Sequence, residues 1–200
     1  MFGCLWLVLA LPASARAQAV LVLGDSISAA YGMSLEQGWV ALLGAELAED
    51  YPDLRMVNAS ISGDTTSGGL RRLPELLQQH QPAIVMLELG GNDGLRGYPI
   101  KTLRANLRQL AEMSRASGAQ VILLPVAIPP NYGSRYTSAF TDSYAVVAEE
   151  TDSILAPVIF AGVATDPELM QPDGIHPTVA AQPLLMRNVL PTLRKVLASP

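Results

Sequence analysis

The chain alternates short apolar runs with longer segments in which apolar residues recur every three or four positions. The clearest apolar runs are residues 19–23, 83–89 and 121–125, and weaker ones lie at 55–59 and 154–158. Runs of this length that are apolar throughout are typical of strands buried on both faces of a parallel sheet. The pattern therefore predicts five strands.

The segments between these runs have helical spacing. Trp39, Leu43 and Leu47 recur at the interval of a helix face, and Pro52 ends the helix that they predict. Strand–helix alternation predicts one α/β domain in which helices cover both faces of a parallel sheet, a three-layer α/β/α sandwich. Further helices are expected over residues 70–81, 103–118, 138–151 and 178–197.

Residues 1–19 resemble an export signal. The apolar run from Leu5 to Leu11 is too short to cross a bilayer as a helix. Two triplets that follow match the A-x-A cleavage pattern and predict cleavage after Ala17 or Ala19. No basic residue precedes the run, so the signal either is atypical or begins upstream. We expect a single domain over residues 20–200, exported to the bacterial periplasm or secreted.

Charge and composition exclude several kinds of site. The net charge is −5 and no basic cluster is longer than Arg71-Arg72, which argues against nucleic acid as a partner. The one cysteine, Cys4, lies in the leader, and His80 and His176 are the only histidines. A disulfide framework, a thiol nucleophile or a histidine-based metal centre is therefore not expected, and neither is a metal or other cofactor. Any catalytic chemistry is therefore expected to use oxygen nucleophiles and carboxylates.

Polar, glycine-bearing segments follow the first three predicted strands at residues 24–28, 60–64 and 90–93. A fourth lies at 173–177, just before the last helix. Ligands of open parallel sheets bind outside the carboxyl ends of the strands, so these segments are expected to meet in one site.

Ser26 is the candidate nucleophile, placed where a strand ends and a helix is expected to open. His176 is the candidate base that would activate it, and Asp173, three residues earlier, would orient the imidazole. Each residue also has an ordinary structural interpretation, since Asp and Ser are frequent helix caps and a histidine before proline often begins a helix. His80, at a predicted helix end, needs no catalytic role.

Asn92 and Gly63 are candidates for stabilising an oxyanion. An Asn side chain supplies amide donors, and a glycine allows close approach of a backbone N–H. Both residue types are also common in turns, so either alone is weak evidence. The combination of all four segments at strand ends is much more specific.

In this order, Gly24-Asp25-Ser26-Ile27-Ser28, Gly63, Gly90-x-Asn92-Asp93 and Asp173-x-x-His176 resemble the SGNH (GDSL) hydrolase superfamily. The similarity is greatest to its bacterial periplasmic thioesterase I/protease I/lysophospholipase group, also called arylesterases. It extends over nearly the whole chain after the leader, through residues 23–31, 37–39, 57–65, 88–96, 129–136 and 170–177.

The resemblance implies a flavodoxin-like sheet of order 2-1-3-4-5 and hydrolysis of acyl esters and thioesters. It implies that Ser26, His176 and Asp173 form a catalytic triad. The oxyanion hole would consist of the Ser26 N–H, the Gly63 N–H and the Asn92 side chain. Other substrate contacts are expected from the same segments, at Asp25, Gly91, Leu95 and Ile175.

Residues 94–99, rich in Gly and Pro, are expected to form either a mobile rim of the acyl site or an ordinary surface loop. At Ala127 many members of the superfamily carry Arg, a departure that leaves the substrate preference open. A carbohydrate acetyl-esterase on the same fold, or a non-catalytic binder of small ligands, is the alternative function. We expect a monomer that acts on a small acyl ester, thioester or lysophospholipid, without nucleic acid or a stable membrane anchor.

Overall fold

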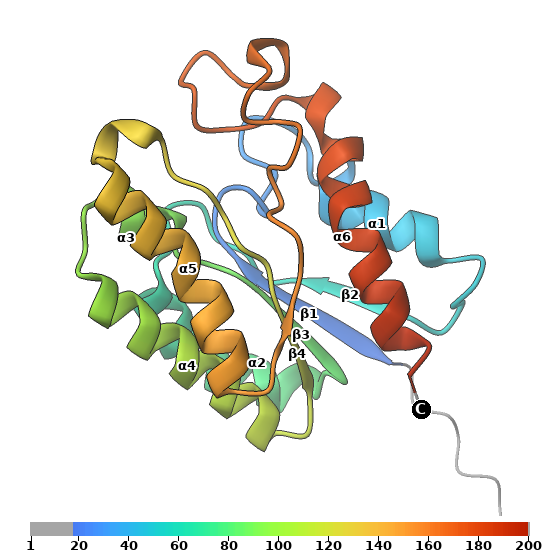
Figure 1. The fold of residues 1–200 in the computed structure, drawn as a ribbon. Helices are drawn as coiled ribbons and strands as arrows, with labels where there is room; N and C mark the ends of the chain where they lie inside the picture. The colour runs from blue at the N-terminus through green and yellow to red at the C-terminus, as the bar shows by residue number, and fades with distance from the viewer. Residues whose placement is uncertain (1–17, 200) are drawn as a thin grey trace, which may run out of the picture.

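A five-stranded parallel sheet forms the centre of the computed structural model, which describes residues 18–199 (Figure 1). Its strand order is β2-β1-β3-β4-β5, which confirms the order 2-1-3-4-5 expected from the resemblance. The strands are β1 (Ala19–Gly24), β2 (Arg55–Asn58), β3 (Ile84–Glu88), β4 (Gln120–Leu123) and β5 (Ile154–Leu155).

Helices cover both faces of this sheet, as Figure 1 shows. One face carries α1 (Trp39–Leu47) and α6 (Gln182–Leu197), and the other carries α2 (Thr66–His80), α4 (Ile100–Ala116) and α5 (Ser134–Glu150). The short helix α3 (Gly91–Leu95) follows β3 directly. Single 3-10 turns lie at Leu35–Gln37, Pro130–Tyr132, Pro167–Leu169 and Val179–Ala181.

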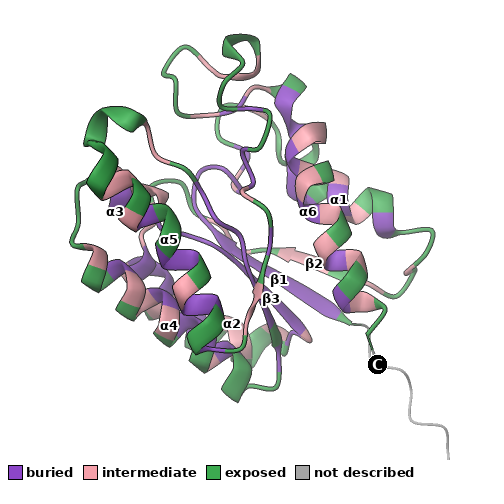
Figure 2. Ribbon diagram, in the orientation of Figure 1, coloured by how far each residue is buried: buried purple, intermediate pink, exposed green. Residues whose placement is uncertain are grey.

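The burial pattern explains why the apolar runs become strands. Every residue of β1 and β3 is buried, whereas the edge strands β2 and β5 are partly exposed. The helices are buried on the side that faces the sheet and exposed on the other (Figure 2). None of the helices within residues 18–199 combines the length and the apolarity that a membrane span requires.

Several element boundaries differ from the sequence-based expectation; α2, for example, begins at Thr66 rather than near residue 70. The strand expected at 154–158 ends at Leu155, because the chain leaves the sheet at Pro157, which has no N–H to donate. The helix expected from residue 138 already begins at Ser134. The helix expected from residue 178 begins at Gln182, after a 3-10 turn.

Candidate active site

The segment after β1 is a series of tight turns rather than the start of a helix. The N–H of Ala29 donates to the Asp25 carbonyl at 2.9 Å, and the N–H of Tyr31 donates to the Ser26 carbonyl at 3.2 Å. The expectation that Ser26 opens a helix is therefore wrong, since α1 begins only at Trp39. These turns place Ser26 at the carboxyl edge of the sheet, where it is buried.

Ser26, His176 and Asp173 form one hydrogen-bonded chain. The Oγ of Ser26 lies 2.9 Å from Nε2 of His176, and Nδ1 of the same ring lies 2.7 Å from Oδ2 of Asp173. The other Asp173 oxygen accepts the backbone N–H groups of Ile175 at 2.9 Å and of His176 at 3.0 Å. The carboxylate therefore holds both the loop and the imidazole.

The charge state of Asp173 suits this arrangement. The backbone N–H of His176, followed by the His176 side chain, lowers the pKa of Asp173 to about 2. An ionised Asp173 favours the tautomer in which Nδ1 carries the proton, so Nε2 can accept the proton of the Ser26 hydroxyl. The geometry thus contains the parts of an activated serine nucleophile. The second histidine, His80, lies in the last turn of α2, as expected.

Asn92 lies in α3, close to the nucleophile. Its Nδ2 donates to Oδ2 of Asp25 at 3.1 Å. The polar, glycine-bearing segment around Asn92 is helical from Gly91 to Leu95. Because Asp25 directly precedes Ser26, this bond fixes the amide beside the nucleophile.

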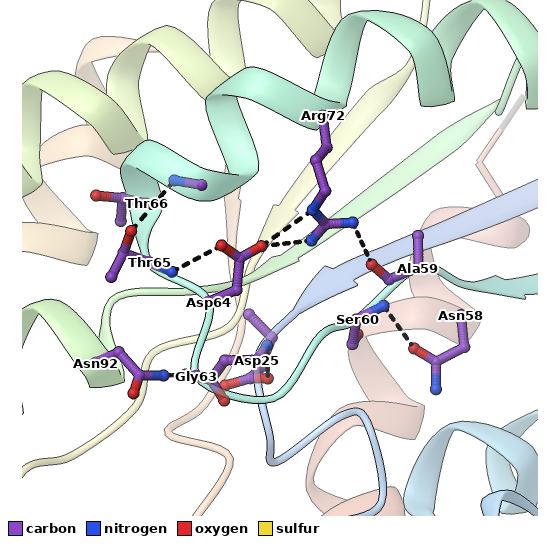
Figure 3. A network of polar contacts seen from close by, with 12 residues as sticks. Asp25, Asn58, Ala59, Ser60, Gly63, Asp64, Thr65, Thr66, Arg72 and Asn92 are labelled. Atoms are coloured by element: carbon purple, nitrogen blue, oxygen red, sulfur yellow. Dashed lines mark hydrogen bonds and ion pairs between the residues drawn. The ribbon is translucent and has the colours of Figure 1, made fainter.

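Gly63 lies in the loop between β2 and α2, beside Asp25 and Asn92 (Figure 3). Its φ of +79° is a backbone conformation that favours glycine. The N–H of Ile61 donates to the carbonyl of Gly24 at 3.1 Å, and Nη2 of Arg96 donates to the carbonyl of Gly63 at 3.1 Å. The loop is therefore held from both sides of the site.

Arg72 of α2 holds the same loop through contacts with Asp64 and Ala59 (Figure 3). Its guanidinium binds Oδ2 of Asp64 at 2.5 and 3.1 Å and donates to the carbonyl of Ala59 at 2.7 Å. Thr65 caps α2 by accepting the N–H of Gly68 at 3.2 Å. Gly63 thus directly precedes a residue held in an ion pair and the N-terminus of α2, which makes its position well defined.

Two carboxyl groups are buried behind Ser26. Oε2 of Glu88, at the end of β3, accepts the Ser28 hydroxyl at 2.7 Å and the backbone N–H of Asp25 at 3.3 Å. Its Oε1 has no partner among the described residues. Gly24 leaves the necessary room, because a Cβ there would lie 2.7 Å from Oε2 of Glu88.

Burial governs the protonation of both carboxyl groups. Loss of hydration raises the pKa of Asp25 to about 6, and it raises the pKa of Glu88 well above its ordinary value. Glu88 is not among the residues predicted from the sequence to have a role, although a carboxylate within the otherwise apolar run 83–89 is a signal that could identify it.

A cavity of about 490 Å³ opens beside Ser26 and His176. All four residues expected to contact substrate line it, namely Asp25, Gly91, Leu95 and Ile175, and so does Asn92, whereas Gly63 does not. The remaining wall is largely apolar and consists of Ile27, Val126, Ala127, Ile128, Pro129, Pro130, Phe160, Ala164, Thr165, Met170 and Gly174. Its size and lining are those of a site for a small, mostly apolar ligand.

Hydrogen bonds hold residues 94–99, the segment expected to form either a mobile rim or an ordinary surface loop. The hydroxyl of Tyr132 donates to the Leu95 carbonyl at 2.8 Å, and that of Tyr136 donates to the Tyr98 carbonyl at 2.7 Å. Within this segment Leu95 lines the cavity. These bonds join residues 94–99 to the 3-10 turn at Pro130–Tyr132 and to the first turn of α5.

Comparison with known proteins identifies the family of the chain. The sequence profile of the GDSL-like Lipase/Acylhydrolase family matches residues 22–183. The chain is 54% identical over 195 residues to Esterase TesA of Pseudomonas aeruginosa, covering 98% of this chain and 96% of that protein. It is 46% identical over 181 residues to Thioesterase 1/protease 1/lysophospholipase L1 of Escherichia coli K12, covering 90% of this chain and 86% of that protein.

Among solved structures, the crystal structure of TesA superposes with a TM-score of 0.87 at 54% identity. The match covers 90% of this chain and 99% of that one. The same fold, a family profile over most of the chain and relatives named as esterase and thioesterase lead to one conclusion. The chain belongs to the GDSL-like lipase/acylhydrolase (SGNH) family and is an ester or thioester hydrolase.

Proposed function

We propose that Ser26, His176 and Asp173 carry out hydrolysis in two acyl-transfer steps. The observation that carries this proposal is the unbroken hydrogen-bonded chain from Ser26 Oγ through the imidazole to Asp173, with distances of 2.9 and 2.7 Å. This is the arrangement that a weakly nucleophilic hydroxyl needs for activation.

In the first step, Ser26 Oγ attacks the acyl carbonyl carbon while Nε2 of His176 accepts the hydroxyl proton. The tetrahedral intermediate collapses, and the same proton passes to the departing alcohol or thiol, which leaves an acyl ester on Ser26. In the second step, His176 takes a proton from water, and the resulting hydroxide attacks the acyl-enzyme. The carboxylic acid leaves, and the proton returns to Ser26.

The oxyanion formed in each step needs donors on the side opposite His176. We assign this role to the backbone N–H groups of Ser26 and Gly63 and to the Asn92 amide. The hydrogen bond from Asn92 to Asp25 and the fastening of the Gly63 loop support it, because preorganised donors stabilise the transition state most.

The acyl chain would occupy the apolar cavity beside Ser26. Its volume of about 490 Å³ and its largely apolar wall favour acyl groups longer than acetyl. Ala127 contributes a small apolar side chain to this wall, where a cationic one would oppose burial of a hydrocarbon chain. We therefore infer fatty acyl esters, acyl thioesters and lysophospholipids as the substrate class.

Substitution of the nucleophile tests the mechanism. Ser26→Ala should lower turnover of a p-nitrophenyl ester by at least ~10³, because the triad acts as a unit. Thermal unfolding of the variant checks that the fold is intact. Turnover within a few-fold of the parent would place the nucleophile elsewhere.

A substrate panel tests the substrate class. Turnover should be greatest for p-nitrophenyl esters with acyl chains of about six carbons or more, with acyl-CoA and lysophosphatidylcholine also cleaved. Turnover of the p-nitrophenyl acetate ester alone would favour a carbohydrate acetyl-esterase. Absence of turnover on every substrate would favour a ligand-binding protein.

A further inference from the structure

The ring of Tyr31 stacks on the imidazole of His176. The two ring centroids lie 4.1 Å apart, and the ring planes differ by 29°. The two hydrogen bonds of the imidazole lie in its plane, to Asp173 on one side and to Ser26 on the other. Neither bond contacts the faces of the ring, and an aromatic ring packed on one face limits how far the imidazole can tilt.

The backbone around Tyr31 is shaped to present this ring. Ala30 has a φ of +56°, which is uncommon for a residue with a side chain, and Gly32 has a φ of +79°. Ala30 is buried, and Gly38 leaves room for it, since a Cβ at Gly38 would lie 2.9 Å from that of Ala30. A strained residue that its surroundings hold in place is a frequent feature of functional sites.

Gln171 joins the Tyr31 segment to the His176 segment. Its Nε2 donates to the carbonyl of Tyr31 and to that of Pro177, both at 3.0 Å. Its backbone N–H donates to the carbonyl of His176 at 2.7 Å. One side chain thus sets the spacing between the backbone that carries the tyrosine and the backbone that carries the histidine.

The Tyr31 ring does little for the core. It is 47% exposed, so its contact with His176 is not a by-product of general burial. The loop that carries His176 lies between β5 and α6, and its regular structure is limited to short turns and one β-bridge between Met170 and Pro177. A residue in such a loop needs restraint from outside it to hold Nε2 in line with Ser26.

We propose that Tyr31 is a positioning residue, which acts through His176 by holding the imidazole in the plane that directs Nε2 to Ser26. This inference rests on the proposed role of His176 as the base. The aromatic ring is the operative part, whereas the phenol hydroxyl contributes nothing to the alignment.

Activity measurements separate this role from substrate binding. Tyr31→Ala should lower kcat about 10-fold or more, because small misplacements of a catalytic group are costly. It should change KM by less than about 2-fold, and Tyr31→Phe should retain the parent kcat. In a His176→Ala background, Tyr31→Ala should cause no further loss, since its effect passes through the imidazole.

Proton NMR tests the stacking without reference to activity. The chain has two histidines, so His176 and His80 give separate ring signals that His176→Ala assigns. The His176 signals should carry a ring-current shift that disappears in Tyr31→Ala and persists in Tyr31→Phe, while the His80 signals stay in place. If Tyr31→Ala unfolds, Tyr31→Leu removes the ring while keeping an apolar side chain.

The outcomes are distinguishable. The positioning role alone would be overturned if the His176 signals did not move in Tyr31→Ala. It would also be overturned if Tyr31→Ala lowered kcat as much in the His176→Ala background as in the parent. A His176→Ala variant with the activity of the parent would instead contradict the proposed function, and the positioning role with it.

Discussion

At the scale of single residues, Asn92 has two hydrogens on its side-chain amide, and within residues 18–199 that amide donates one hydrogen bond, to Asp25. The other hydrogen is left for a ligand in the cavity that Asn92 lines. An amide donor adds little to a carbonyl oxygen in the ground state and much more to the oxyanion of the transition state. Removal of the Asn92 amide is therefore expected to lower kcat.

Asn92→Ala should lower kcat by ~10²–10³ and change KM little. Asn188→Ala is a matched control, because that amide binds the carbonyls of Ile159 and Ala161 and serves only the structure. The control should lower the thermal midpoint and leave kcat intact. If Asn92→Ala behaved like this control, Asn92 would have no part in the oxyanion hole.

The sequence was informative at the residues with the most specific chemistry. Ser26, Asp173 and His176 could be named as candidates because their spacing and the ends of apolar runs pointed to one edge of the sheet. The stack of Tyr31 on His176 could not, since it depends on two loops that only the fold brings together. Nor could the sequence show that the Glu88 carboxyl turns toward Ser28.

At the scale of elements, apolar runs predicted the central strands well because both faces of the sheet are covered. The same signal failed beyond β5. Ala156 and Ile159 are buried although they lie outside the strand, and each donates one backbone hydrogen bond to the β4 segment, at Leu123 and Pro125, without continuing the regular ladder. The start of α5 was missed because Ser134 to Thr137 show no apolar periodicity.

The first strand bears on the position of signal cleavage, although residues 1–17, which make up most of the predicted signal, lie outside the described part of the chain. The carbonyl of Gln18 accepts the N–H of Arg55 at 3.0 Å, and that of Ala19 accepts the N–H of Ala83 at 2.9 Å. Ala19 is the buried first residue of β1. Cleavage after Ala19 would remove both bonds, whereas cleavage after Ala17 retains them.

We therefore predict that the exported protein begins at Gln18, as intact mass or N-terminal sequencing will show. A form that begins at Val20 should unfold more readily than one that begins at Gln18, with each lost hydrogen bond worth about 1 kcal/mol. A mature terminus at Val20, or an uncleaved exported chain, would contradict this prediction.

At the scale of the whole molecule, the buried carboxyl groups behind Ser26 couple folding to pH. The pKa of Glu88 is raised by burial, so the folded protein keeps a proton that the unfolded chain releases above about pH 4.3. The contribution of Glu88 to stability is then fully present below that pH and is lost as pH rises through the folded-state pKa. Asp25, whose pKa is raised to about 6, contributes in the same direction.

Glu88→Gln should remove its part of this dependence. The difference in unfolding free energy between the variant and the parent should shift in favour of the variant by up to about 1.4 kcal/mol per pH unit from about pH 5 up to the raised pKa of Glu88 in the folded protein. Denaturant unfolding at several pH values measures it, and Glu49→Gln, at an exposed site, is the control. Parallel pH profiles for Glu88→Gln and the parent would show that Glu88 is not protonated in the folded protein.

The central prediction for the molecule is that Ser26 forms a covalent acyl intermediate with the help of His176 and Asp173. A p-nitrophenyl alkylphosphonate tests it most directly, because its attack by an activated serine gives a stable tetrahedral adduct that resembles the transition state. Peptide mass spectrometry of the inactivated protein should find one phosphonyl group, on Ser26, and labelling should slow greatly in His176→Ala. Inactivation with the label on another residue, or with Ser26 unmodified, would contradict the proposed mechanism.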